Sequence, residues 1–387
     1  MLAFFLRFLR SLRANHFLPS VPFRENSSNS PQRVPSFAAM PKYAGVFLDS
    51  IGYELAPVVV SSVELEERLT PLYARLRVQP GQLEALTGIT ERRWWDEGTP
   101  LSRGAIAAAR RALAASGVPV GEIGALIYAG VCREQFEPAT ACRVADGIGV
   151  SARTAVYDLS NACLAVMNGI LDVANRIQLG QIRAGMVVSC ESAREINEVM
   201  IQRMLAASSM EQFTLGLATL TGGSGAIALV LTDGSFGGPR GHRLVGGVTR
   251  TAPQHHALCR WGLAPLEGRG AEQFMSTDSI AVMKHGVELG RRTWADFLAE
   301  LGWTADQVDR VCCHQVGSAH QKQILDVLGI ATTKDFSTYP HLGNIGTVSL
   351  PITAAIAAER GYLKPGQRVA FLGIGSGLNC LMLGWEW

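Results

Sequence analysis

An internal repeat constrains the fold of this chain more than any other feature of its sequence. Residues 116–130 align without gaps with residues 301–315, and residues 161–192 resemble residues 343–377. The first pair reads as the end of an amphipathic helix, a short turn and an apolar strand. The second pair reads as a loop, a buried helix, a glycine turn and a buried strand. We therefore expect two similar α/β halves related by a pseudo-twofold axis.

The register of the repeat brings two polar residues together. Placing Gly180 on Gly361 gives an offset of 181 residues, which sets Cys163 against Asn344. In folds of this type ligands collect at the carboxyl ends of the strands, where helices from both halves can begin. Cys163 and Asn344 are therefore expected to face one shared site.

Composition narrows the class of protein. Hydrophobic residues make up 48% of the chain and glycines number 41, which suits buried parallel strands alternating with helices. The formal net charge is only +2, so the composition does not indicate nucleic-acid binding. The sequence has no run of 18 apolar residues and therefore predicts no transmembrane helix. The eight cysteines form no CxxC pair, so we expect no metal site, reduced thiols and a cytoplasmic protein.

The chain is expected to divide into three parts. Residues 1–42 read as a disordered extension, or as the product of an upstream start codon with Met40 as the true beginning. The alternative is a basic amphipathic helix lying on a membrane. Residues 43–235 would form the first half and residues 236–387 the second.

Cys163 precedes a segment, Leu164 to Ile177, that is apolar on nearly all sides and is predicted to be a buried helix. The unpaired N–H groups and the dipole at the start of a helix favour a thiolate and lower the pKa of a thiol. Ser160 and Asn161 are residues of the type that caps a helix. The alternative is a structural thiol, because free cysteine is often buried.

His314 follows the apolar strand "DRVCC" in the second half. The repeat places it at the carboxyl end of that strand, on the same side as Cys163, and a Cys–His pair is a route to an activated thiol. His320 is expected on the surface. His255 and His256 are expected in a polar loop without a metal-binding partner.

Two glycine-rich loops could supply hydrogen-bond donors. Asn344 lies in "HLGNIG" and could donate its amide to a carbonyl oxygen, or it could simply cap a turn. Gly375, Ser376 and Gly377 follow another apolar strand, and their backbone could donate to an oxyanion. A phosphate-binding loop is the rival interpretation of this second segment.

Taken together, "NAC", "HQ", "GNIG" and "GIGSG" resemble the thiolase superfamily, in particular its ketoacyl synthase III branch, over about residues 43 to 387. The resemblance implies a five-layered αβαβα sandwich of two halves, and a homodimer. It implies that Cys163 accepts the acyl group, that His314 and Asn344 complete a catalytic triad, and that Gly377 donates an N–H to the thioester oxygen.

Glu137 in "EPATA" stands where ordinary ketoacyl synthase III enzymes usually carry an apolar residue. This resembles the branch that condenses two fatty acyl-CoAs head to head in long-chain olefin biosynthesis. There the glutamate would reach the active site of the partner subunit and act as a base. A plain acyl-CoA needs such a base because its α-C–H is only weakly acidic, and burial would raise the pKa of the carboxyl. The alternative is a surface acid in a loop.

The implied activity is a Claisen condensation of two acyl-CoAs, with coenzyme A only as part of the substrate and with downstream enzymes of hydrocarbon biosynthesis as partners. A decarboxylative synthase that uses malonyl-carrier protein and a non-catalytic acyl-binding subunit are the alternatives. Gln82 and Leu86 replace the Trp and Arg that often hold the CoA adenine in ketoacyl synthase III enzymes. Arg92, Arg93 and Trp94 are candidate substitutes.

Overall fold

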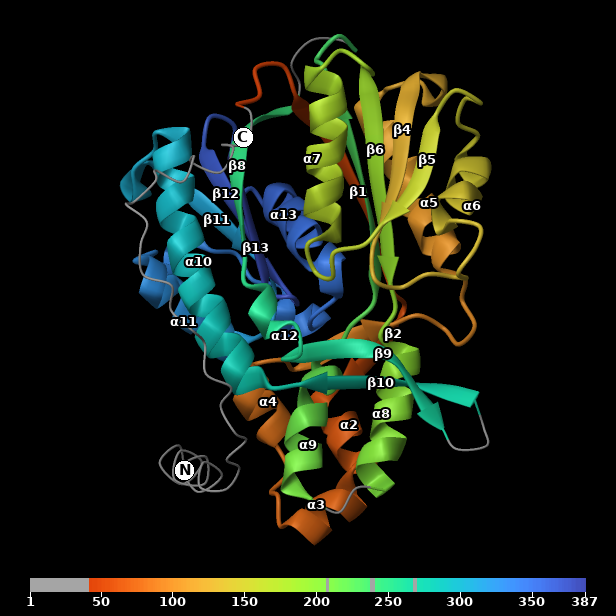
Figure 1. Cartoon of the computed structure of the whole chain (residues 1–387), viewed down its shortest axis with the longest axis vertical. Helices are drawn as coiled ribbons and strands as arrows, with labels where there is room; N and C mark the ends of the chain where they lie inside the picture. The colour runs from red at the N-terminus through yellow and green to blue at the C-terminus, as the bar shows by residue number, and fades with distance from the viewer. Residues whose placement is uncertain (1–41, 207–208, 237–240, 267–269) are drawn as a thin grey trace, which may run out of the picture. The chain divides into compact units, whose positions relative to one another are not determined.

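The computed structural model describes residues 42–206, 209–236, 241–266 and 270–387. The expected N-terminal extension lies outside the described residues, apart from its last position. Within them, nine strands form one mixed sheet in the order β5-β4-β6-β7-β1-β8-β13-β12-β11 (Figure 1). The strands are β1 (Phe47–Leu55), β4 (Ile123–Ala129), β5 (Ala155–Leu159), β6 (Ala184–Glu191), β7 (Gly225–Thr232), β8 (His242–Thr251), β11 (Arg310–Cys313), β12 (Arg368–Gly375) and β13 (Asn379–Glu386).

The strand order repeats the same pattern on both sides of the β1–β8 pair. Strand β4 pairs in parallel with β5 and β6, and β11 pairs in parallel with β12. The other neighbours are antiparallel, so the expected parallel sheet is in fact mixed. An isolated parallel bridge between Val311 and Asp335 takes the position that β5 has in the first half.

Helices lie on both faces of each half-sheet. The elements are α5 (Leu101–Ser116) and α6 (Thr140–Ile148) on the outer face of the first half, α7 (Ala165–Gln178) and α13 (Ser349–Glu359) between the halves, and α10 (Ser279–Leu301) and α11 (Ser318–Leu328) on the outer face of the second half (Figure 1). The five-layered αβαβα arrangement expected from the resemblance is thereby confirmed.

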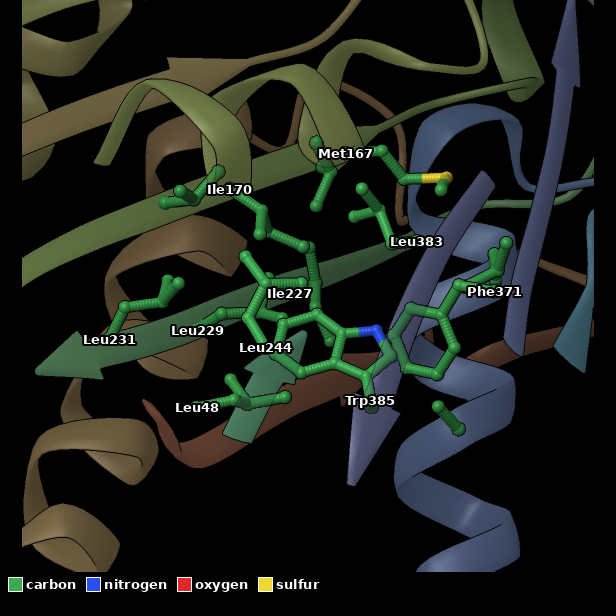
Figure 2. Packing of buried hydrophobic residues seen from close by; sticks show 14 of the residues in the cluster. Leu48, Met167, Ile170, Ile227, Leu229, Leu231, Leu244, Phe371, Leu383 and Trp385 are labelled. Atoms are coloured by element: carbon green, nitrogen blue, oxygen red, sulfur yellow. The ribbon is translucent and has the colours of Figure 1, made fainter. Parts of the chain in front are cut away.

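The central layer explains why α7 is apolar on nearly every side. Met167 and Ile170 of α7 belong to one apolar cluster with Leu229 of β7 in the first half-sheet and with Phe371 and Trp385 in the second (Figure 2). A helix between two sheets exposes little surface to water, so it needs no polar face. The observed span of α7 agrees with the predicted helix to within one residue at each end.

A second group of elements packs around an apolar cluster of its own, beyond the carboxyl end of β6 (Figure 1). Its elements are β2 (Val58–Ser61), α2 (Ser62–Arg68), α3 (Thr70–Leu76), α4 (Gln82–Thr87), β3 (Glu91–Trp94), α8 (Arg194–Ala206), α9 (Met210–Leu217) and β10 (Gly270–Thr277). Strand β9 (Cys259–Leu266) pairs with β10, and α12 (Tyr339–Leu342) packs against β3. This group covers the end of the sheet at which the predicted site residues emerge.

Candidate active site

Cys163 lies in a strained turn between β5 and α7. The preceding residue, Ala162, has a φ of +45°, a left-handed conformation that costs an L-residue other than glycine about 1–3 kcal/mol. The N-cap residue of α7 is Leu164 and makes no side-chain cap bond, so the predicted capping by Ser160 or Asn161 is wrong. Asn161 instead donates to Asn168 and accepts from Asn379. These bonds tie the turn to α7 and to β13, and hold Cys163 at the junction.

Burial raises the pKa of the Cys163 thiol to about 12, and the nearby Cys259 and Glu191 add to the rise. The expectation that the helix start lowers this pKa is therefore wrong for the resting protein, because loss of solvation outweighs the local N–H groups. The residue as a whole is still partly exposed. Cys163 therefore carries a protonated thiol near pH 7.

The end of β12 lies directly against the Cys163 turn. A Cβ atom on Gly375 would be 3.5 Å from the backbone nitrogen of Cys163, and one on Gly373 would be 2.6 Å from Leu164 Cδ2. A side chain at position 373 would therefore displace Leu164, and glycine at both positions lets the strand lie close to the turn. The Gly375–Gly377 loop, predicted as a source of donors, is thus brought to the cysteine.

His314 emerges beside the same strand end. Its backbone N–H donates to Leu372 O of β12 over 3.0 Å, and its side chain is only 5% exposed. Burial and the neighbouring His320 lower the pKa of His314 to about 3. His314 is therefore neutral near pH 7 and can both donate and accept a proton.

The surface placement predicted for His320 is wrong. Its side chain is buried and lines a small cavity together with His314, Ile324 and Ile374. Burial lowers the pKa of His320 to about 4. His320 lies on the buried face of α11, with Ile324 and Leu328 at spacings of four residues, so its side chain faces β12 rather than water. His255, predicted in a polar loop, stacks on His285 with ring centroids 3.9 Å apart.

Asn344 is held by its backbone next to the start of β7. Its N–H donates to Thr221 O over 2.9 Å, and its carbonyl accepts from the N–H of Gly223 over 3.0 Å. The side-chain Oδ1 accepts from the Gly346 N–H, which turns Nδ2 the other way. Within the described part of the chain Nδ2 has no hydrogen-bond partner, so it is available as a donor.

Sequence reasoning missed Glu191, the last residue of β6. Its side chain is 4% exposed, and it accepts from the backbone N–H groups of Val131 (3.0 Å) and Cys132 (3.2 Å). A Cβ on Gly346 would lie 3.4 Å from Glu191 Cγ. The available signal was a lone acid at the end of the buried strand "AGMVVSC", whose carboxyl end faces the site.

Glu137 is exposed within the single chain. It lies in the segment 131–139 between β4 and α6, next to Phe136, whose side chain is 96% exposed. The burial expected for Glu137 is therefore absent within one subunit. Its role as a base depends on a second subunit and stays a prediction.

The comparisons with known proteins identify the family of the chain. The family model for the C-terminal part of 3-oxoacyl-[acyl-carrier-protein] synthase III matches residues 298–387. An acyl-CoA:acyl-CoA alkyltransferase of Shewanella oneidensis is 59% identical over 348 residues, which cover 89% of this chain and 100% of the relative.

The chain belongs to the acyl-CoA:acyl-CoA alkyltransferase family.

Two further comparisons support the assignment to this family. An acyl-CoA:acyl-CoA alkyltransferase of Xanthomonas campestris is 36% identical, over 89% of this chain and 99% of the relative. The crystal structure of cerulenin-bound OleA from Xanthomonas campestris superposes with a TM-score of 0.84 at 35% identity, over 89% of this chain and 98% of the solved one. The predicted thiolase fold and the predicted branch are thereby confirmed.

The residues suggested for adenine binding are structural. Arg92 is fully buried and donates to Val60 O and Ser62 Oγ, while Trp94 donates to Gly222 O. Arg93 is part-buried and donates to Ala56 O. These bonds hold β2 and β3 in place, so Arg92 and Trp94 are not free to hold an adenine.

Among the described residues, no group of three or more His, Cys, Asp or Glu side chains is arranged to hold a metal ion. No helix in that part of the chain has the length and apolar character needed to cross a membrane.

Proposed function

We infer that this chain joins two fatty acyl-CoAs head to head, in a Claisen condensation without decarboxylation that gives a 2-alkyl-3-ketoacyl product. The observation that carries the inference is the Cys163 thiol on its strained turn, in a chain whose relatives are named acyl-CoA:acyl-CoA alkyltransferases. The Xanthomonas campestris relative has been solved with bound lauric acid and lauroyl-CoA.

In the first step the Cys163 sulfur attacks the thioester carbonyl of one acyl-CoA. The acyl group stays on the sulfur and CoA leaves as a thiol. Because Cys163 is protonated at rest, its proton must leave as the new C–S bond forms. The neutral imidazole of His314 can accept that proton and return it to the CoA sulfur.

The developing oxyanion needs donors that are already in place. We assign this role to Asn344 Nδ2 and to the backbone of Gly375, Ser376 and Gly377. The support is their position, since Gly375 lies against Cys163 and the orientation of the Asn344 amide is fixed by the Gly346 N–H.

In the second step Glu137 removes an α-proton from the second acyl-CoA. The resulting carbanion attacks the acyl-Cys163 carbonyl, a C–C bond forms and the Cys163–acyl bond breaks. The proton held by Glu137 returns to the sulfur, which restores the thiol. Hydrolysis of the remaining CoA thioester would release the 2-alkyl-3-keto acid.

The spacing of substitutions studied in the relative supports these roles. Solved variants of the Xanthomonas campestris protein include one at a cysteine and one at a glutamate 26 positions before it, the spacing that separates Glu137 from Cys163. A histidine has also been replaced there, although its distance from the cysteine along the chain differs from that between Cys163 and His314.

We further propose that the protein acts as a homodimer, in which each subunit supplies Glu137 to the site of the other. The nearly complete exposure of Phe136 supports this arrangement, because a large apolar side chain at a loop tip is stabilised by a partner surface. The cytoplasm is the proposed compartment. Enzymes that reduce or decarboxylate β-keto acids in hydrocarbon biosynthesis are the proposed next partners.

A decarboxylative synthase is the second candidate. A β-ketoacyl-[acyl-carrier-protein] synthase III of Rhodospirillum rubrum is 27% identical to this chain. This identity is lower than that of the two alkyltransferases. A malonyl donor generates its carbanion by losing CO2, so that reaction would not need Glu137. The third candidate, a non-catalytic acyl-binding subunit, would leave Cys163 unacylated.

One experiment separates the three candidates. Purified protein is incubated with myristoyl-CoA, with and without malonyl-carrier protein, and its mass and its products are analysed by mass spectrometry. Condensed product from myristoyl-CoA alone, absent in Cys163→Ala, supports the first. Product and CO2 only with malonyl-carrier protein, unaffected by Glu137→Ala, support the second. An unmodified Cys163 with no product supports the third.

A further inference from the structure

The segment 131–139 that carries Glu137 is anchored at both ends by a carboxylate. At its start, Glu191 of β6 accepts from the N–H groups of Val131 and Cys132. At its end, Asp158 of β5 accepts from the N–H groups of Thr140 and Ala141, each over 2.9 Å. The two strands flank β4, which leads into the segment.

The anchor at the start of the segment leaves little freedom. A Cβ on Gly130 would lie 2.9 Å from Glu191 Oε1, so a larger residue here would displace the carboxylate. Tyr128 adds a third bond by donating to Cys132 O over 3.0 Å. Burial raises the pKa of the Glu191 carboxyl, while the N–H groups of Val131 and Cys132 favour its ionised form.

The anchor at the end of the segment begins a helix. Thr140 and Ala141 are the first residues of α6, whose own N-cap Ala139 makes no side-chain cap. Asp158 therefore satisfies donors that the helix cannot pair internally, and a carboxylate is favoured at that position. Between the two anchors, Phe136 and Glu137 stand exposed at the tip.

We propose that Glu191 and Asp158 are positioning residues that fix the 131–139 segment, and through it the place of the Glu137 carboxylate, for the condensation step. This rests on the proposed function, in which Glu137 removes the α-proton. Glu191 also packs on Gly346 beside Asn344. It thereby connects the site of its own subunit with the segment that serves the other subunit.

The proposal predicts a separation of the two half-reactions. In Glu191→Gln one N–H of the segment loses its acceptor and faces an amide donor, so the tip shifts while Cys163 stays in place. A displacement of about 1 Å can cost about 100-fold in rate. Condensation should fall about 10- to 100-fold. Acylation of Cys163 is compared in Asp158→Asn, where it should stay within about twofold of wild type, because besides burial Glu191 itself raises the pKa of the Cys163 thiol. Asp158→Asn should act in the same direction.

The matched control is Glu66→Gln. Glu66 is also buried, at 6% exposure, and also accepts from two backbone N–H groups, those of Gly81 and Leu83. It lies in α2 and anchors a different segment. If Glu191 acted only on general stability, both variants would lower acylation and condensation together.

The experiment measures three quantities in each variant. They are acylation by intact mass after mixing with myristoyl-CoA, the ratio of condensed product to free myristic acid, and hydrogen–deuterium exchange of residues 130–141. We expect Glu191→Gln and Asp158→Asn to lower the ratio and to speed exchange in that segment, and Glu66→Gln to do neither. An unchanged ratio in Glu191→Gln would overturn the proposal.

Two further outcomes are informative. If Glu191→Gln does not fold, Glu191→Asp replaces it, because the shorter side chain keeps the carboxyl but withdraws it from the two N–H groups. The ratio of condensed product to free myristic acid is then measured in Glu191→Asp. If the wild type makes no condensed product, the proposed function fails. Faster exchange confined to residues 130–141 would still establish the anchor, and unchanged exchange would overturn it.

Discussion

The backbone N–H of Val166 donates to Thr347 Oγ1 over 2.8 Å, and the two residues are 181 positions apart in the sequence. This is the offset that relates the two halves of the repeat. The bond therefore joins pseudo-equivalent positions at the starts of α7 and α13, close to the axis between the halves. Its importance for the site is that Val166 lies three residues after Cys163 and Thr347 three residues after Asn344.

Thr347→Val tests this junction. The variant keeps the shape of the side chain but leaves a buried N–H at Val166 without an acceptor, which costs about 1–3 kcal/mol. We expect that loss in urea unfolding, together with slower acylation of Cys163. Thr293→Val is the control, because that buried hydroxyl donates to a carbonyl within its own helix. An equal loss of acylation in both variants would contradict a specific role of the junction.

The repeat shows how far sequence reasoning reaches. It predicted the paired elements, because each half keeps its own pattern of apolar strands and helices, and it brought Cys163, His314 and Asn344 to the same edge. It could not show the left-handed Ala162, since backbone strain is imposed by what surrounds a turn. It missed Glu191 and misplaced His320, because their burial depends on segments distant in the sequence.

The protonation state of Cys163 gives a second prediction. Because burial raises its pKa to about 12, the thiolate fraction should keep growing with pH across the alkaline range. Alkylation of the free enzyme by iodoacetamide should therefore rise about tenfold per pH unit from pH 7 to 9 without a plateau. Cys163→Ala identifies the signal by mass. A plateau near pH 7 would mean that the N–H groups at the helix start lower the pKa of Cys163 more than burial raises it.

His314 and His320 give a third prediction, on stability. Their pKa values in the folded protein, about 3 and about 4, lie below the ordinary value of about 6.5. The unfolded chain therefore takes up protons first as the pH falls, so stability is full above about pH 6.5 and is lost below it. Each histidine contributes a slope of about 1.4 kcal/mol per pH unit in that window.

The His320→Gln variant isolates this effect. Its free energy of unfolding, measured with urea at pH 7.5, 6.0 and 5.0, should fall less steeply than that of the wild type. The variant must be compared with the wild type at each pH, because Asp335 changes the stability of both proteins. Burial raises the pKa of Asp335 to about 6, so its protonation stabilises the fold as the pH falls. Parallel curves for the two proteins would show that His320 takes up its proton in the folded state.

The last prediction concerns the supply of Glu137 by the partner subunit. It needs two inactive variants in one dimer. Cys163→Ala lacks the nucleophile and Glu137→Gln lacks the base, so each alone should make no condensed product. Co-expressed with different affinity tags and purified over both, they should regain about half of one wild-type dimer's activity. The base on the Cys163→Ala subunit would then serve the cysteine of the other. Adding Asp158→Asn to the Cys163→Ala subunit should lower the regained activity about 10- to 100-fold, whereas adding it to the Glu137→Gln subunit should leave most of it. No regained activity in the mixed dimer would place the base and the thiol in the same subunit's site. Equal loss in both arrangements would mean that Asp158 does not act through the Glu137 segment of its own subunit.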